Sequence, residues 1–123
     1  MINDLRKILQ SKLKEIPNLN CGRAKADDVI IENEIYYGYE LTYALTSSDQ
    51  GYDYDEYDIT LTGRLVSKNK SIKEMDEIAN EIAKVLKSLR IKYTIQDVTQ
   101  YDKINKLIIN GRCNMNTINY KLR

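Results

Sequence analysis

The chain has 123 residues, of which 42% are hydrophobic and 30% charged, with a formal net charge of +1. This balance is typical of one globular domain over residues 1–123 and excludes a disordered chain. No apolar run approaches the roughly 20 residues that span a bilayer, and the N-terminus lacks a signal-peptide core. We therefore expect a cytoplasmic protein with no membrane partner.

The charged residues are distributed unevenly along the chain. Residues 25–60 carry ten acidic and one basic side chain, whereas residues 61–123 carry thirteen basic and six acidic ones. Such a division is typical of a solvated acidic loop beside a basic helix. It would also suit a head-to-tail ring, in which an acidic edge of one copy meets a basic edge of the next.

The first part of the chain predicts a helix and a short strand. Residues 2–16 (INDLRKILQSKLKEI) have the apolar spacing of a helix, with Asn3 as its cap, and Pro17 ends it. Residues 18–22 contain Asn18, Asn20 and Gly22 and are predicted to form a loop. The short apolar run DVIIE at residues 28–32 is predicted to be a strand.

Two alternating runs then predict a long antiparallel hairpin. In residues 34–46 one side of the strand carries Tyr37, Tyr39, Leu41, Tyr43 and Leu45. In residues 57–66 the corresponding side carries Tyr57, Ile59, Leu61, Gly63 and Leu65. The acidic tip of the hairpin, residues 47–56, is expected to extend past the core.

The clearest signal is an amphipathic helix at residues 71–90 (SIKEMDEIANEIAKVLKSLR). Ser71 and Glu74 have the spacing of a capping box, in which each side chain satisfies a backbone N–H at the helix start. The apolar stripe of this helix comprises Ile72, Met75, Ile78, Ala79, Ile82, Ala83, Val85, Leu86 and Leu89.

The last third of the chain predicts a second hairpin. Residues 91–96 alternate, with Ile91, Tyr93 and Ile95 on one side, and turn residues follow at 97–105. Residues 107–115 alternate again, and the change of parity at Ile118 and Tyr120 indicates a bulge or a strand end around residues 114–117. The elements predict the α+β class: an antiparallel sheet of four to five strands, formed by two hairpins and packed against two helices, in the order α-β-β-β-α-β-β.

No residue pattern indicates an enzyme, a cofactor or a metal. Histidine is absent, the five glycines are scattered, and Cys21 and Cys113 lack metal-site spacing, so reduced thiols and no catalytic role are expected. The carboxylates of the hairpin tip could suggest calcium, but they lack the EF-hand spacing. A solvated loop or an acidic contact surface accounts for them better.

Tyrosine is the unusual feature of the composition: there are ten tyrosines, no Phe and no Trp. Alternating tyrosines can stack on single-stranded nucleic acid, but this region is acidic and would repel phosphates. We expect Tyr37, Tyr39 and Tyr43 in the core and Tyr52 and Tyr54 exposed, where they would suit a protein interface or plain surface equally.

The basic face of helix 71–90 supports an alternative function. Its basic side chains could contact nucleic acid in a small binding or regulatory module. Acidic residues are interleaved on the same face, however, which is typical of an ordinary salt-bridged helix. The basic residues are Lys70, Lys73, Lys84, Lys87, Arg90 and Lys92.

The order of elements resembles that of the tail terminator proteins of bacteriophages, also called tail completion or head-tail joining proteins, which have equivalents in phage-tail-like bacteriocins. The resemblance covers nearly the whole chain. It is carried by the N-terminal helix, the long tyrosine-rich hairpin, the junction from DYDEYDITLTGRLVSKN into SIKEMDEIANEIAKVLKSLR, and the closing hairpin.

This resemblance implies a structural, non-enzymatic role in a virion or phage-tail-like particle assembled in the bacterial cytoplasm. Family members form a homo-oligomeric ring, typically a hexamer, that caps the tail tube and ends its polymerisation. The implied partners are the tail tube protein, a head-completion or neck protein, and a sheath protein if the tail is contractile. No family motif transfers by residue, so the predicted interface rests on exposure and chemistry: Tyr52, Tyr54, Asp55 and Tyr57.

Overall fold

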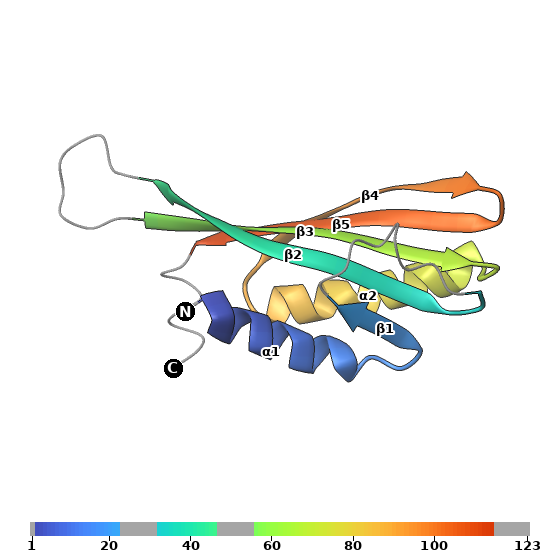
Figure 1. Cartoon of the computed structure of the whole chain (residues 1–123), viewed down its shortest axis with the longest axis horizontal. Coiled ribbons are helices and arrows are strands. Elements are labelled where there is room, and N and C mark those ends of the chain that lie inside the picture. The colour runs from blue at the N-terminus through green and yellow to red at the C-terminus, as the bar shows by residue number, and fades with distance from the viewer. Residues whose placement is uncertain (1, 23–31, 47–55, 115–123) are drawn as a thin grey trace.

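The computed structural model describes residues 2–22, 32–46 and 56–114, which form two helices and a five-stranded mixed sheet (Figure 1). The elements are α1 (Ile2–Lys14), β1 (Leu19–Gly22), β2 (Ile35–Thr46), β3 (Glu56–Lys68), α2 (Ile72–Ser88), β4 (Lys92–Tyr101) and β5 (Ile104–Asn114). This confirms the α+β class and the predicted order of elements.

The sheet has the strand order β1-β2-β3-β5-β4. The pairs β2–β3, β3–β5 and β4–β5 are antiparallel, as predicted, but β1 pairs with β2 in parallel, so the sheet is mixed and not antiparallel throughout. Within the described part of the chain, β4 is the outermost strand on one side. On the other side β1 covers only the Ile35–Gly38 part of β2.

Both helices lie on one face of the sheet, and the core lies between them and the strands (Figure 1). The predicted alternation is confirmed where side chains are described: Tyr37, Tyr39 and Leu41 of β2 are buried, as are Ile59, Leu61 and Leu65 of β3. The opposite face carries exposed polar side chains and has no helix in the described chain. Exposed residues on that face are Glu40, Thr42, Thr60, Thr62, Arg64, Lys92, Thr94 and Arg112.

Helix α2 begins as predicted at Ser71, whose Oγ accepts a hydrogen bond from the Glu74 N–H at 3.2 Å. Most of its apolar stripe is buried, including Met75, Ile82 and Leu86. Ile72 is the exception, because 44% of its surface remains exposed at the first turn of the helix. The predicted stripe therefore overestimates the buried side of α2 at its N-terminal end.

The structure corrects the prediction for residues 18–22. They were expected to form a loop, but Leu19–Gly22 is strand β1, with its residues opposite Ile35–Gly38. The strand expected at 28–32 falls mostly outside the described residues; Glu32, which is described, forms an isolated bridge with Lys68. The residues after Pro17 thus return along α1 and extend the sheet.

The turn of the second hairpin is also shorter than predicted. Strand β4 continues to Tyr101, with a register shift between Gln96 and Thr99, and β5 begins at Ile104. Only Asp102 and Lys103 remain as the turn, and both have positive φ angles, of 46° and 63°. Two such residues form the tight connection whose twist matches antiparallel strands. Met115 and the expected bulge at 114–117 fall outside the described residues, apart from Asn114 at the end of β5.

Candidate functional site

Three of the four predicted interface residues lie outside the residues that the structure describes: Tyr52, Tyr54 and Asp55. Tyr57 lies in β3, opposite Leu45 of β2, but its side chain is not among those described. The proposed role of these four residues stays a prediction.

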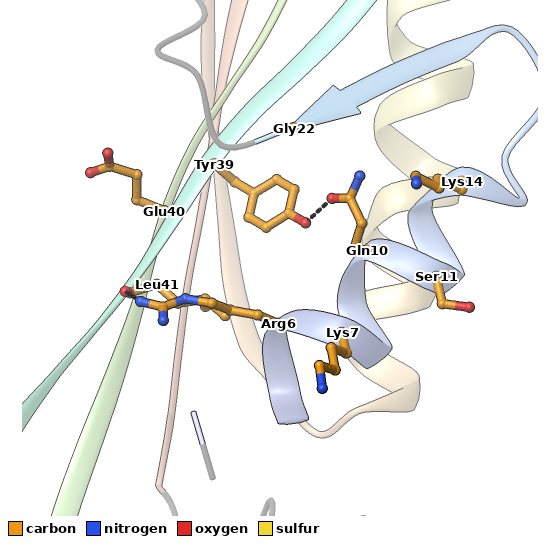
Figure 2. A pocket seen from close by; sticks show the side chains of 9 residues that line it. All are labelled: Arg6, Lys7, Gln10, Ser11, Lys14, Gly22, Tyr39, Glu40 and Leu41. Atoms are coloured by element: carbon orange, nitrogen blue, oxygen red, sulfur yellow. Dashed lines mark hydrogen bonds between the residues drawn. The ribbon is translucent and has the colours of Figure 1, made fainter. Parts of the chain in front are cut away.

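A groove lies between α1 and β2, at the point where β1 ends (Figure 2). Its volume is about 530 Å³. Helix α1 supplies one wall, the Tyr39–Leu41 part of β2 supplies the other, and the backbone of Gly22 closes one end. The lining residues are Arg6, Lys7, Gln10, Ser11, Lys14, Gly22, Tyr39, Glu40 and Leu41. We call this the α1–β2 groove.

The spacing of residues in α1 explains the character of this groove. Lys7, Ser11 and Lys14 recur at intervals of four and three residues and therefore lie on one side of the helix. They are exposed, whereas Leu5, Leu9 and Leu13 on the core side are completely buried. The helical wall of the groove is polar and basic, and the strand wall contains the buried side chains of Tyr39 and Leu41.

Two side chains of α1 are fixed by hydrogen bonds across the groove. The Arg6 guanidinium donates from Nη2 to the backbone oxygen of Leu41 at 3.0 Å. Gln10 accepts a bond from the Tyr39 hydroxyl at Oε1 and donates from Nε2 to the Cys21 oxygen at 3.4 Å. Helix α1 is thereby tied to the outer edge of β2 and to β1.

A buried tyrosine pair lies beneath the groove. The rings of Tyr37 and Tyr39 stack with centroids 5.6 Å apart. The Tyr37 hydroxyl donates to the Ile109 oxygen of β5 at 2.8 Å, and burial, with a smaller contribution from Tyr39, raises the pKa of Tyr37 well above its usual range. A hydroxyl that stays protonated and holds a backbone oxygen serves packing rather than proton transfer.

The Tyr37 hydroxyl takes the place of a backbone hydrogen bond between β3 and β5. Gly63 of β3 lies opposite Ile109 in the register of the two strands, but its N–H donates instead to Asn110 Oδ1 at 3.1 Å. A Cβ on Gly63 would overlap the Tyr37 hydroxyl. The β3–β5 ladder is therefore open at its centre, and Tyr37 and Asn110 satisfy the backbone groups that the opening leaves.

A second groove, of about 450 Å³, lies between α2 and the outer strand β4. It is lined by Glu77, Asn80, Glu81, Ala83, Lys84, Lys87 and Tyr93. Tyr93 and the next residue on the same side, Ile95, are 39% and 40% exposed although they face the helical side of the sheet. Helix α2 contacts β3, β4 and β5 but leaves these two side chains of β4 partly uncovered.

The described residues contain no group of three or more possible metal ligands. The two cysteines are free thiols, as predicted. Burial raises the pKa of Cys21, a rise that Lys14 opposes. Burial and the Asp58 carboxylate raise the pKa of Cys113 to about 11. Low-pKa thiolates are the reactive ones, so neither site has the character of a nucleophile.

The two grooves were not predicted from the sequence. Each lies between a helix and an outer part of the sheet, where an open strand edge can pair with another chain. The alternation at residues 91–95 could have indicated the second groove, because two helices are too few to cover every apolar side chain of a five-stranded sheet.

Among the described residues, neither helix has the length and the apolar character needed to span a membrane.

Comparison with known proteins adds no identity. No protein-family model matches the chain, and no curated protein matches it.

Proposed function

We propose that this chain is a structural protein of a phage tail or phage-tail-like particle. It forms a ring that caps the tail tube, ends tube polymerisation and joins the tail to the head or collar. The resemblance in element order and at the β3–α2 junction supports this proposal. The role requires no catalytic site, cofactor or metal.

The proposal rests on the two edges of the sheet, which are wholly or partly unpaired within the described chain. β4 has no strand on its outer side within the described chain, and β1 pairs with β2 only as far as Gly38. Open edges in a small sheet invite pairing with another chain, and two different edges on one molecule favour a head-to-tail contact. A head-to-tail contact that closes gives a ring.

The predicted contact residues Tyr52, Tyr54, Asp55 and Tyr57 fit this role by their position in the chain. β2 and β3 run past the helical layer at the end that joins them through residues 47–55 (Figure 1). A hairpin end that leaves its own core can contact the tail tube, a neck protein or the next copy. We propose the tail tube protein and a head-completion or neck protein as partners, with a sheath protein where the tail is contractile.

The proposal is tested by measuring the solution mass by light scattering over a range of concentration and salt, with and without purified tail tubes. We expect a closed ring alone or on tubes, and tubes of uniform length when the protein is present during polymerisation. A chain that stays monomeric and leaves tube length unchanged would contradict the proposal. Salt-dependent nucleic-acid binding by such a monomer would favour the alternative module that uses the basic face of α2.

A further inference from the structure

We propose that neighbouring copies join by antiparallel pairing of β4 of one copy with the outer edge of β2 of the next. In this seam Tyr93 and Ile95 enter the α1–β2 groove of the neighbouring copy. The inference rests on the proposed ring, because it names the surfaces that close it. The result is one continuous sheet around the assembly.

The strand register places part of β4 level with part of β2. Leu41 lies opposite Leu61, Leu61 opposite Gly111, and Gly111 opposite Tyr93. Tyr93 and Leu41 are therefore at the same level of the sheet, on its two opposite edges. By the same register, Ile95 is level with Tyr39. If the ring axis runs along the strands, copies are related by rotation alone, and these residues meet.

The backbone N–H and C=O groups at these two edges also point in suitable directions. Arg6 reaches the Leu41 oxygen from the outer side of β2, so the Leu41 backbone points away from β3. Along a strand, the backbone N–H and C=O groups of successive residues point alternately to one side and to the other. Two opposite residues of antiparallel strands point either both toward each other or both away from each other. Following the register across the sheet, the Tyr93 N–H and C=O point outward from β4. The bond of Gly63 N–H toward β5 and that of Ile109 oxygen toward β3 agree with this assignment.

Leu41 and Tyr93 therefore present matching donors and acceptors to each other across the seam. With β2 and β4 antiparallel, as the topology requires for copies related by rotation, the two residues form a hydrogen-bonded pair. The Leu41 oxygen has two lone pairs, so it can accept from Tyr93 while Arg6 stays bound. In the isolated chain Arg6 protects this edge.

The single chain leaves two large side chains of β4 partly uncovered. Tyr93 and Ile95 lie on the helical side of β4, at 39% and 40% exposure. The α1–β2 groove opens on the same side of the sheet, and its strand wall is formed by Tyr39 and Leu41, the residues level with them. Opposite residues of paired strands point to the same face, so the seam places the two exposed apolar side chains in this groove.

The charged side chains on the face of the sheet opposite the helices fit the same register. Thr94 is level with Glu40, and Lys92 is level with Thr42, so Lys92 and Glu40 become diagonal neighbours across the seam. Both side chains are exposed. Diagonal neighbours on one face lie within reach of long side chains, and opposite charges there attract. This charge complementarity points to a second copy as the occupant of the edge.

The seam is also limited in length by the structure. β1 occupies the edge of β2 over Ile35–Gly38, and this part is level with Gln96 and the residues after it. The register shift of β4 lies between Gln96 and Thr99. Bulges bend a strand and end regular pairing, so β4 can turn away where β1 begins. Because the bridge of Gly22 with Gly38 uses the Tyr39 N–H, regular pairing is expected for residues 91–94 with residues 40–43.

A disulfide between copies tests the register directly. Glu40 and Thr94 would form a non-hydrogen-bonded pair with Cα atoms about 4.5 Å apart, which a disulfide can bridge. We expect the Glu40→Cys, Thr94→Cys double variant, in a background with Cys21→Ser and Cys113→Ala, to give covalent oligomers under mild oxidation. The matched control is Thr62→Cys with Thr94→Cys, in which Thr62 lies on the central strand and cannot reach a neighbour's β4.

A charge exchange gives a second, independent readout. Lys92→Glu and Glu40→Lys should each raise the concentration at half assembly by about two- to tenfold at low salt, because each places like charges across the seam. The double variant Glu40→Lys, Lys92→Glu restores the attraction and should recover most of the loss. If the loss of assembly in the double variant equals the product of the losses in the two single variants, the contact between Lys92 and Glu40 is contradicted.

The outcomes separate this inference from the proposed function. Covalent rings from Glu40→Cys, Thr94→Cys together with recovery in the charge exchange support the seam. A ring seen by light scattering that gives neither result overturns the seam and leaves the ring function standing. Covalent rings that do not cap tubes support the seam and contradict the tail function. A chain that remains monomeric with and without tubes overturns both.

Discussion

Gly63 shows how a single residue determines the centre of the sheet. The Tyr37 ring crosses from β2 over Gly63 so that its hydroxyl reaches the Ile109 oxygen of β5. Only a residue without a Cβ leaves room for this crossing. The alternation of the sequence placed Gly63 and Tyr37 on the buried side, but it could not show that one passes over the other, because that contact joins three strands.

We predict that Gly63→Ala lowers the free energy of unfolding by about 2–4 kcal/mol. The added methyl group displaces the Tyr37 hydroxyl and leaves the Ile109 oxygen without its donor. Urea unfolding of the variant measures the loss. As a control, Tyr37→Phe should cost about 1–3 kcal/mol alone and clearly less in the Gly63→Ala background, since the same bond is then already broken. Additive losses would show that the two residues do not act through one contact.

The buried thiol of Cys113 predicts a loss of stability at alkaline pH. The folded chain keeps its proton up to a pKa of about 11, whereas the unfolded thiol releases it near pH 9.0. The folded state then binds more protons, so the free energy of unfolding is highest below pH 9 and falls as pH rises toward 11. Tyr37, whose pKa is also raised, extends the fall above pH 10.

Unfolding in urea at several pH values between 8 and 11 measures this slope. We expect Cys113→Ala to have a shallower slope than the parent chain above pH 9. Cys21→Ser is the comparison, because Cys21 is only partly buried and Lys14 opposes the rise of its pKa. Equal slopes in Cys113→Ala and the parent chain would show that another group carries the effect.

Among the elements, the β4–β5 turn offers a direct test of backbone strain. Lys103 has a φ of 63°, a left-handed conformation that costs a residue with a Cβ about 1–2 kcal/mol. Lys103→Gly removes this cost, and after the added entropy of glycine we expect a gain of about 0.5–1 kcal/mol in the free energy of unfolding. Lys103→Ala removes the same charge without relieving the backbone and should give no gain. A comparable gain in both variants would assign the effect to charge.

The elements that were predicted correctly are long and have a strong period. Helices α1 and α2, hairpin β2–β3 and strand β5 each repeat their pattern over ten residues or more. β1 was missed because four residues, two of them Asn20 and Gly22, carry no clear period. Its strand character comes from pairing with Ile35–Gly38, a contact with a distant segment that local sequence does not encode.

Strand β4 was predicted, but its surroundings were not. The alternation of Ile91, Tyr93 and Ile95 indicates a strand with one apolar side, and Ile91 is indeed buried. Whether a helix covers the other two depends on where α2 crosses the sheet, which only the three-dimensional packing shows. The exposed pair Tyr93 and Ile95 is therefore the feature of the candidate site that sequence could suggest but not locate.

At the scale of the whole molecule, two helices divide the sheet unequally. α1 lies against β1 and β2, α2 lies mainly against β3, β4 and β5, and the far side of β4 stays uncovered in the described chain (Figure 1). Exposed apolar side chains at a sheet edge reduce solubility unless another chain covers them. The arrangement is consistent with a subunit whose fold is completed in an assembly.

A substitution at Ile95 separates assembly from folding. Ile95→Thr keeps a β-branched residue in the strand, and because Ile95 is already 40% exposed, we expect the free energy of unfolding of the monomer to change by less than about 1 kcal/mol. If the seam buries this side chain, assembly should weaken about tenfold, which light scattering across a dilution series measures. Ile72→Gln is the matched control: Ile72 is 44% exposed, but it lies at the start of α2, away from the 91–95 part of β4. Equal weakening of assembly in both variants would show that general surface hydrophobicity, and not the β4 edge, holds the copies together.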